Sequence, residues 1–217
     1  MYFSNRVRAG QQLAAKLLRY RDSRTTIIAL SDGAVVVGAQ IAAVLHCPIT
    51  LLLIEPIELP GEHEPVAVIN DEGIFTYNHK YSPGQLEDFN MEYRQYIEQA
   101  KLEKLHDMHH LLGSGGLIRK DLLEGHNVIL VSDGMSSGFS LEAAADYLKA
   151  IKTKKLIIAT PMASVSAVDR MHILTDEIHC LSVIENYIGT NHYYEDNAMP
   201  SHSTIVKTIE NIVRHWH

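Results

Sequence analysis

Residues 128–141 read VILVSDGMSSGFSL, and this stretch decides the fold class. An apolar run leads into Asp133, a turn of glycines and serines follows, and the segment ends in residues that favour a helix. A buried strand, a turn and a helix form the repeating unit of an α/β sheet. Successive backbone N–H groups, three hydroxyls and the positive end of a helix dipole favour a bound phosphate. From the residues alone, the same turn is equally typical of a helix cap that binds no ligand.

The rest of the chain repeats this alternation of strands and helices. Apolar periodicity predicts strands at 27–30, 49–54, 127–131, 156–160 and 177–181, and helices at 7–20, 35–45, 141–151, 165–174 and 204–216. It also predicts a hairpin from 66–69 and 73–77 and a long helix at 87–110 that ends before the glycines of 113–116. We therefore expect one α/β domain over 1–217, with a mainly parallel sheet of about five strands flanked by helices. Ligand sites in such sheets lie at the carboxyl ends of strands, here after Leu30, Ile54, Val131 and Thr160.

Composition excludes several classes of protein. The chain has 217 residues, 46% of them hydrophobic and 21% charged, with a formal net charge of −7. Its basic residues are scattered, which argues against binding to a nucleic-acid backbone. No apolar run approaches the ~18 residues of a membrane helix, and the start lacks a secretory core, so we expect a cytoplasmic protein without a membrane contact. The two cysteines, Cys47 and Cys180, exclude a disulfide framework and are predicted to be small buried side chains.

Familiar catalytic and metal-binding motifs are missing or weak. No Gly-x-Gly-x-x-Gly follows the first strand, and neither a Walker Gly-Lys-Ser/Thr nor a Gly-x-Ser-x-Gly elbow occurs. These absences argue against a dinucleotide dehydrogenase, a P-loop ATPase and an α/β-hydrolase. His106, His109 and His110 share one helical face, which suits a transition metal if Asp107 or Glu103 assists. A solvated helix face is the simpler interpretation.

The order of residues in 128–141 resembles a known motif. Apolar residues, an acid, two hydroxyl residues, a glycine, one further residue and another hydroxyl form the phosphoribosyl-diphosphate (PRPP) motif of type I phosphoribosyltransferases. The resemblance extends to a bacterial group of predicted phosphoribosyltransferases over the segments FSNRVRAGQQL, ALSDGAVVVGAQIAAVL, 60–78, IIATPMASVS and DEIHCL. It implies the type I phosphoribosyltransferase-like fold, a small hood from about 1–22 and 186–217, and a homodimer.

The resemblance also implies a reaction and a set of site residues. Such enzymes are transferases of the glycosyltransferase class in nucleotide metabolism, which pass the phosphoribosyl group of PRPP to a nitrogen acceptor with Mg²⁺. Asp133 would hold the ribose or the metal. A phosphate would lie on Asp133, Gly134, Met135, Ser136, Ser137, Gly138, Phe139 and Ser140, and diphosphate on Ser31, Asp32, Gly33 and Ala34. Tyr193 and Tyr194 match a tyrosine-rich segment that packs near the mouth of the site.

This chain departs from its relatives where they carry charge. They have two adjacent acids at the end of the motif strand, whereas here Ser132 precedes Asp133. Asp32 replaces an arginine of the first loop, and Glu55 and Pro56 replace two cations after the second strand. Each lost charge-assisted contact is worth about 1.5–3 kcal/mol, so three losses weaken PRPP binding by roughly three orders of magnitude. We therefore expect weak or absent PRPP turnover.

Two other roles remain open from the sequence. One is a non-catalytic binding module for a small phosphorylated metabolite, either a nucleoside monophosphate or a sugar phosphate. The other is a structural or regulatory subunit. Phe139 bears on this choice because it stands at a position that is small in the relatives, where its bulk would close the phosphate loop unless the ring points away.

Overall fold

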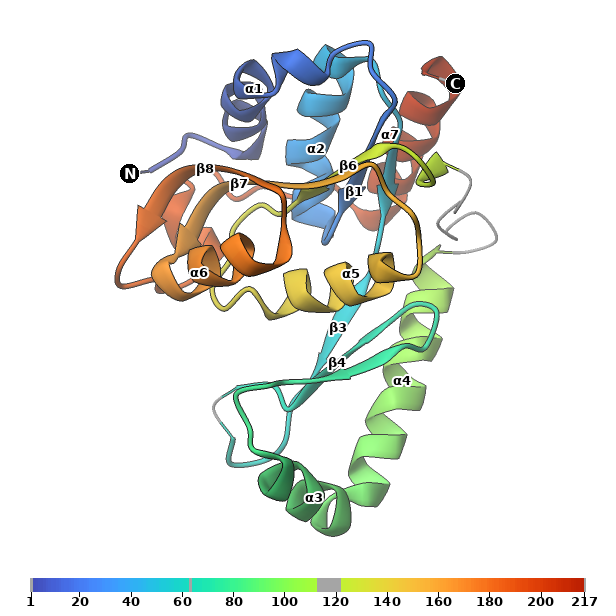
Figure 1. Ribbon diagram of the computed structural model, residues 1–217, viewed down its shortest axis with the longest axis vertical. Helices are drawn as coiled ribbons and strands as arrows, with labels where there is room; N and C mark the ends of the chain where they lie inside the picture. The colour runs from blue at the N-terminus through green and yellow to red at the C-terminus, as the bar shows by residue number, and fades with distance from the viewer. Residues whose placement is uncertain (1, 63, 113–121, 217) are drawn as a thin grey trace. The chain divides into compact units, whose positions relative to one another are not determined.

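The computed structural model describes residues 2–62, 64–112 and 122–216 (Figure 1). These residues separate into two compact units, one formed by 2–52 and 122–216 and the other by 53–62 and 64–112. From the sequence we expect one domain over 1–217, with a hood from about 1–22 and 186–217. The first unit contains the parallel sheet and every residue of the candidate site described below.

A five-stranded sheet forms the centre of the first unit. Its strands are β1 (Thr25–Ala29), β2 (Ile49–Leu51), β6 (Asn127–Val131), β7 (Lys155–Ser164) and β8 (Glu177–Ile184). The spatial order is β2-β1-β6-β7-β8, and all neighbours are parallel. Every residue of β1 and β6 is buried, as the unbroken apolar runs predict for central parallel strands. The predicted α/β class with a central parallel sheet is confirmed.

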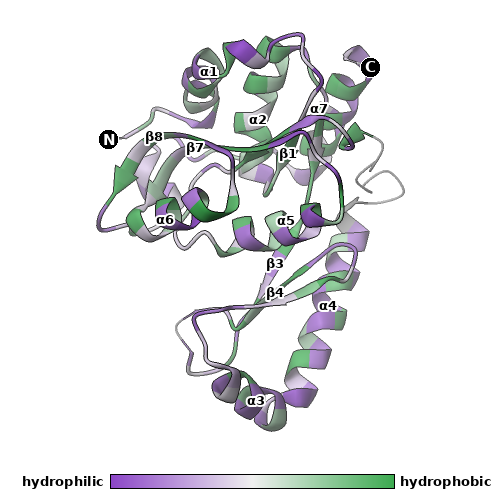
Figure 2. Ribbon diagram, viewed as in Figure 1, coloured by the Kyte–Doolittle hydropathy of each residue, from purple (hydrophilic) through white to green (hydrophobic). Residues whose placement is uncertain are grey.

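Helices cover both faces of this sheet. They are α1 (Arg6–Lys16), α2 (Asp32–Leu45), α5 (Phe139–Lys149), α6 (Val165–Leu174) and α7 (His202–His215), with 3₁₀ turns at Leu18–Tyr20 and Thr190–Tyr193. Figure 1 shows α1, α2 and α7 on one face and α5 and α6 on the other. Helix α2 packs between α1 and α7, which accounts for its largely hydrophobic colouring in Figure 2.

The strand order brings two loops together. The chain runs outward from β1 to β2 and then returns to β6 on the other side of β1. The order in which successive strands are added to the sheet therefore reverses between β1 and β6, although all strands stay parallel. Loops that follow strands on either side of such a switch point form a crevice. Here Ser31, directly after β1, donates a hydrogen bond from Oγ to Oδ1 of Asp133, after β6, at 3.1 Å. The candidate site is built at this point.

The second unit combines a small antiparallel sheet with two helices. Strands β3 (Ile54–Ile57), β4 (Ala67–Asn70) and β5 (Phe75–Tyr77) pair in that order, and helices α3 (Pro83–Glu92) and α4 (Arg94–Leu112) follow. The predicted hairpin is confirmed by the antiparallel pairing of β4 with β5. Figure 2 shows hydrophilic and hydrophobic turns alternating along α4.

Several predicted boundaries are wrong. The strand expected at 49–54 is two strands, because β2 pairs with β1 only as far as Leu51 and Ile54 pairs with Asn70 in the other sheet. The helix expected at 87–110 breaks at Tyr93, whose φ of −110° ends α3. Helix α1 stops at Lys16 instead of residue 20, and β7 and β8 extend beyond 160 and 181. The glycines of 113–116 lie outside the described residues.

The histidines of α4 do not form a metal site. The Nε2 atom of His109 lies 2.9 Å from the backbone oxygen of Asp71, so this ring joins α4 to the β4–β5 turn. Within 2–62, 64–112 and 122–216 no group of three or more His, Cys, Asp or Glu side chains is placed to hold a metal ion. No helix in the same ranges has the length and apolar character needed to cross a bilayer.

Asp71 in the β4–β5 turn makes the stability of the second unit depend on pH. Its side chain is buried, with 2% of the residue exposed, and neither carboxylate oxygen has a hydrogen-bond partner among the described residues. Burial, assisted by Glu72, raises its pKa from 3.8 to about 6, although His109 opposes the shift. The folded state thus binds the proton more tightly than the unfolded state. The contribution of Asp71 to stability is fully present below about pH 4 and is lost as the pH rises to about 6.

We expect Asp71→Asn to remove this pH dependence. Relative to the wild type, the free energy of unfolding of the variant should rise by about 2 kcal/mol between about pH 4.5 and about pH 7.5. Urea denaturation at both pH values measures the difference. Asp88→Asn, which changes an exposed carboxylate of α3, is the control and should show no such trend. Parallel pH profiles for wild type and Asp71→Asn would contradict the prediction.

Candidate functional site

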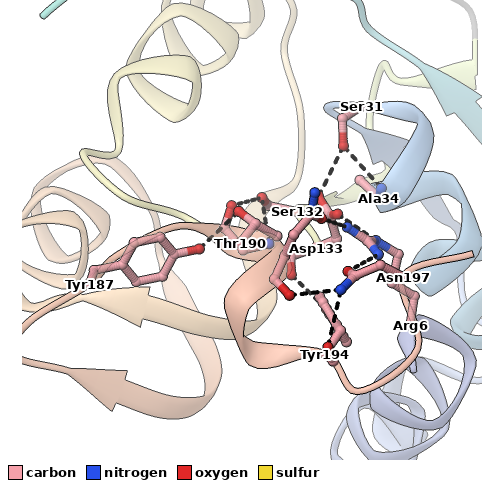
Figure 3. A network of polar contacts seen from close by, with 11 residues as sticks. Arg6, Ser31, Ala34, Ser132, Asp133, Tyr187, Thr190, Tyr194 and Asn197 are labelled. Carbon is pink, nitrogen blue, oxygen red and sulfur yellow. Dashed lines mark hydrogen bonds and ion pairs between the residues drawn. The ribbon is translucent and has the colours of Figure 1, made fainter. Parts of the chain in front are cut away.

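Asp133 is held by side chains from two other elements. It follows β6, and the residue is only 9% exposed. Arg6, the first residue of α1, donates from Nε to Oδ2 of Asp133 at 2.7 Å, and Ser31 Oγ donates to Oδ1 at 3.1 Å (Figure 3). Both carboxylate oxygens therefore already have a partner from the chain itself. A ribose or a metal, the predicted ligands of Asp133, would compete with Arg6 and Ser31 for these oxygens.

Arg6 also fastens the C-terminal tail to the site. Its Nη2 donates to Asn191 Oδ1 at 2.7 Å and its Nη1 to Asn197 Oδ1 at 3.2 Å. The guanidinium carbon lies 4.5 Å from the centre of the Tyr194 ring, a cation–π contact. Every nitrogen of the buried guanidinium thus has a partner, and the group joins α1, the loop after β6 and the tail (Figure 3).

Tyr194 supports the same loop through its hydroxyl group. This hydroxyl donates to the backbone oxygen of Asp133 at 2.6 Å. Burial first, and then the neighbouring carboxylate of Asp133, raise the pKa of Tyr194, so the hydroxyl stays protonated and remains a donor. The sequence placed this tyrosine near the mouth of the site as packing, and the structure adds a specific hydrogen bond to the residue that follows the motif strand.

Two glycines allow these segments to approach each other. A Cβ on Gly33 would lie 2.1 Å from Asp133 Oδ2 and 2.9 Å from Arg6 Nε. A Cβ on Gly134 would lie 2.5 Å from the hydroxyl of Tyr187, which is itself hydrogen-bonded to Thr190 at 2.9 Å. A side chain at Gly33 would clash with the buried ion pair, and one at Gly134 would displace the side chains of Tyr187 and Thr190. The ion pair and the tail are therefore packed directly against the backbone of the two loops.

The four residues predicted to receive diphosphate form the start of α2. Ser31 is the N-cap, and its Oγ accepts from the backbone N–H of Ala34 at 3.0 Å. The carboxylate of Asp32 lies 2.9 and 3.0 Å from Nδ1 of His202, at the start of α7. The helix dipole favours an anion at this end, but here the protein's own carboxylate occupies it. Gly33 supports Asp133 as described above.

These groups line one cavity with a volume of about 520 Å³. Its walls include Ser31, Asp32 and Gly33 from the start of α2, Arg6 and Asp133, and the tail residues Asn191 and Met199. Among the described residues that line it, the carboxylates are Asp32 and Asp133, and the cation, Arg6, is already paired with the second of them. Two carboxylates and a paired cation make the cavity better suited to the hydroxyl and amine groups of a ligand than to a phosphate or diphosphate group.

The predicted phosphate loop leaves several of its backbone N–H groups without a partner among the described residues. In the described part of the chain, the backbone N–H groups of Ser136, Ser137 and Gly138 make no hydrogen bond. Gly138 adopts a left-handed conformation, with φ 72°, and caps α5 without a side-chain acceptor. Three free N–H groups at the positive end of a helix can bind an anion.

Other contacts hold this loop in place from β7. Met135 N–H donates to Met162 O at 3.1 Å, and Ser164 N–H donates to Met135 O at 2.9 Å. The Ser164 hydroxyl also donates to Ser136 O. Phe139 is buried, with 5% of the residue exposed. The loop is thus anchored on its inner side, while Ser136 stays exposed.

Two residues that the sequence comparison singled out, Glu55 and Pro56, lie outside the first unit. Glu55 and Pro56 belong to β3 of the second unit, where Glu55 Oε2 pairs with Lys104 Nζ at 3.0 Å. Sequence reasoning missed Arg6, Asn191 and Asn197. The segment FSNRVRAGQQL resembles known relatives, but nothing local in it indicates that Arg6 reaches Asp133.

A family model matches more than half of the chain. The model described as "Phosphoribosyl transferase domain" matches residues 75–196. The chain belongs to this family. The match includes β6, the loop after it and α5, and so covers Asp133 and the predicted phosphate loop of this phosphoribosyl transferase domain.

Relatives show similarity over nearly the whole domain. A protein of Mycobacterium tuberculosis named "Putative phosphoribosyl transferase Rv0571c" is 23% identical over 214 residues, which are 96% of this chain and 46% of that protein. The chain thus spans about half the length of the curated relatives it matches. The crystal structure of TT1426 from Thermus thermophilus has a TM-score of 0.74 at 21% identity, over 97% of this chain and 99% of that one. This likeness shows that the two chains share a fold, and together with the family match it confirms the predicted phosphoribosyltransferase-like fold.

Proposed function

We propose that this phosphoribosyl transferase domain binds a ribose-type phosphate monoester, a sugar phosphate or a nucleoside monophosphate, and turns over PRPP weakly or not at all. The observation that carries the proposal is the run of three free N–H groups at Ser136, Ser137 and Gly138 before α5, within the described part of the chain. A phosphate monoester needs backbone donors, hydroxyls and a helix end, and all of these are present.

The groups around Asp133 are the reason to propose that turnover of PRPP is weak or absent. A diphosphate at the start of α2 would face the carboxylate of Asp32, which adds repulsion where charge-assisted donors are needed. Ribose hydroxyls would compete with Arg6 and Ser31 for the oxygens of Asp133. Transfer also needs the departing diphosphate to be stabilised as negative charge develops on it, and the guanidinium of Arg6 in the cavity wall is already paired.

The residues present do not fit a protein-held Mg²⁺. Magnesium sites use one or two free carboxylates together with substrate phosphates. Both oxygens of Asp133 are engaged, and Asp32 pairs with His202. We therefore propose that ligand binding at this site is independent of Mg²⁺.

A transferase that uses PRPP is the second candidate, and membership of the family favours it. If the domain is active, its substrate would be PRPP and its acceptor a nitrogen nucleophile, with Mg²⁺ bound through the substrate's own phosphates. A structural or regulatory subunit is a third possibility. A homodimer and a cytoplasmic location stay predictions from the sequence.

Placing a charge on the loop tests the proposed phosphate site. We expect Ser137→Glu to lower the affinity for ribose 5-phosphate by about 10–100-fold, because a carboxylate would compete for the N–H groups and repel the phosphate. Calorimetric titration measures this affinity. The change should cost little stability, since the Ser137 hydroxyl makes a weak contact with Phe139 N–H, at 3.4 Å.

Asn211→Glu is the matched control, since it adds the same charge on an exposed position of α7. It should leave the affinity unchanged. If Ser137→Glu binds ribose 5-phosphate as tightly as the wild type, the ligand does not lie on this loop. If the wild type binds neither ribose 5-phosphate nor a nucleoside monophosphate, the proposed function is wrong.

A further inference from the structure

Arg6 joins parts of the chain that are far apart in sequence. Its partner Asp133 lies 127 positions away, and Asn191 lies 185 positions away. The residue is 6% exposed, so its guanidinium has exchanged water for these partners. A buried guanidinium is stable only while its donors are satisfied, and removing a partner is costly. Because one guanidinium makes all three contacts, loss of any one of them weakens the hold of Arg6 on the other two partners.

The tail that Arg6 holds pairs with the N-terminal segment through backbone hydrogen bonds. We call residues 189–199 the tail wall, because Gly189, Asn191 and Met199 line the cavity. Glu195 N–H donates to Phe3 O and Asp196 N–H to Ser4 O, each at 2.9 Å. Asn197 Nδ2 donates to Asn191 O at 2.8 Å, which couples both asparagines that Arg6 holds. The tail wall is thus held by a short backbone pairing with the N-terminal segment, by the buried rings of Tyr193 and Tyr194 and by Arg6, and the contacts on its cavity side are those of Arg6 with Asn191 and Asn197.

The same contacts restrict access to Asp133. With Arg6 in place, the side chain of Asp133 is 12% exposed, and the cavity beside it is bounded by the tail wall. We propose that Arg6 is a positioning residue that clasps the tail wall shut, and that a ligand reaches Asp133 only when the Arg6 contacts to Asn191 and Asn197 open. The site alternates between a clasped state, in which Arg6 holds Asn191 and Asn197, and an open state, in which these contacts are broken and ligand hydroxyls reach the Asp133 carboxylate.

Hydrogen exchange of the full chain tests the clasp without any ligand. The backbone N–H groups of Glu195 and Asp196 report opening of the tail wall, and those of β1 report global unfolding. In Arg6→Gln, exchange at Glu195 and Asp196 should become about tenfold faster or more, and by a larger factor than in β1, where loss of the buried ion pair lowers global stability. Asn197→Ala, which leaves the Arg6–Asp133 pair intact, should act in the same direction. Arg8→Gln, on the exposed side of α1, is the control.

Arg6→Gln leaves the buried carboxylate of Asp133 without its cation. If this single variant fails to fold for that reason alone, the double variant Arg6→Gln with Asp133→Asn takes its place, because it removes both charges and therefore leaves no unpaired charge. Unchanged exchange at Glu195 and Asp196 in Asn197→Ala and in the neutral double variant would overturn the clasp. An equal acceleration in β1 would also overturn it, because Arg6 would then have a purely structural role.

A kinetic measurement with ribose 5-phosphate rests on the proposed function. In Asn197→Ala both association and dissociation should be faster by about tenfold, as expected when a closing segment is loosened. Slower association would overturn the clasp. If ribose 5-phosphate does not bind the wild type, the proposed function fails, whereas the clasp is still decided by the exchange of Glu195 and Asp196.

Discussion

Gly33→Ala should both destabilise the protein and abolish the geometry of the site. The added methyl would lie 2.1 Å from Asp133 Oδ2, 2.6 Å from its Cγ and 2.9 Å from Arg6 Nε. These atoms cannot move aside freely, because the ion pair and Ser31 fix the carboxylate. We expect the free energy of unfolding to fall by about 2–4 kcal/mol, from overpacking and a damaged buried ion pair. Affinity for ribose 5-phosphate should fall by about tenfold or more.

Urea denaturation and calorimetry measure the two effects of Gly33→Ala. Gly84→Ala is the matched control, since a Cβ there meets nothing within 4 Å among the described residues. The cause can be checked in an Asp133→Ala background, where the clash with the carboxylate is absent and the added cost of Gly33→Ala should be smaller. Equal costs in both backgrounds would show that the methyl group does not act through Asp133.

Glu177→Gln should have a comparable effect on stability at a position away from the candidate site. The carboxylate of Glu177 accepts from Tyr20 Oη and Lys155 Nζ at 2.6 Å each and from His179 Nε2 at 2.5 Å, and Arg19 also contacts it. Its side chain is 13% exposed. One carboxylate thus joins the 3₁₀ turn after α1 to β7 and β8.

Replacing this carboxylate by an amide removes its charge while two cations still converge on the position. We expect the free energy of unfolding to fall by about 2–3 kcal/mol, as for hydrogen bonds to a partly buried charge. Urea denaturation checks the prediction. Glu185→Gln, at an exposed position after β8, should change stability by less than about 0.5 kcal/mol. A loss of the same small size in Glu177→Gln would contradict the structural role of the network.

The core of the fold could be predicted because it depends on local patterns. The apolar runs of β1 and β6 and the glycine–serine turn before α5 are each contained in a few residues, and parallel packing then brings Ser31 beside Asp133. The predicted ends of strands and helices are less accurate. The run 49–54 is largely apolar, so nothing in it marks the change from β2 to β3.

The contacts of Arg6 could not be predicted for a different physical reason. An arginine at the start of an amphipathic helix is usually solvated, and its burial here depends on a tail that arrives nearly two hundred residues later. Asn191 and Asn197 lie in a polar segment without periodicity, which is typical of a loop. Such long-range polar contacts follow from the tertiary structure and have no local signature.

Calorimetric titration of PRPP and of ribose 5-phosphate, each with and without Mg²⁺, tests the central claim most directly. Ribose 5-phosphate should bind with the same affinity in both conditions, because backbone N–H groups hold the phosphate. PRPP should bind no more tightly than ribose 5-phosphate, because its diphosphate would face Asp32. Tight PRPP binding that depends on Mg²⁺, together with transfer of the phosphoribosyl group to a nitrogen acceptor, would contradict the account.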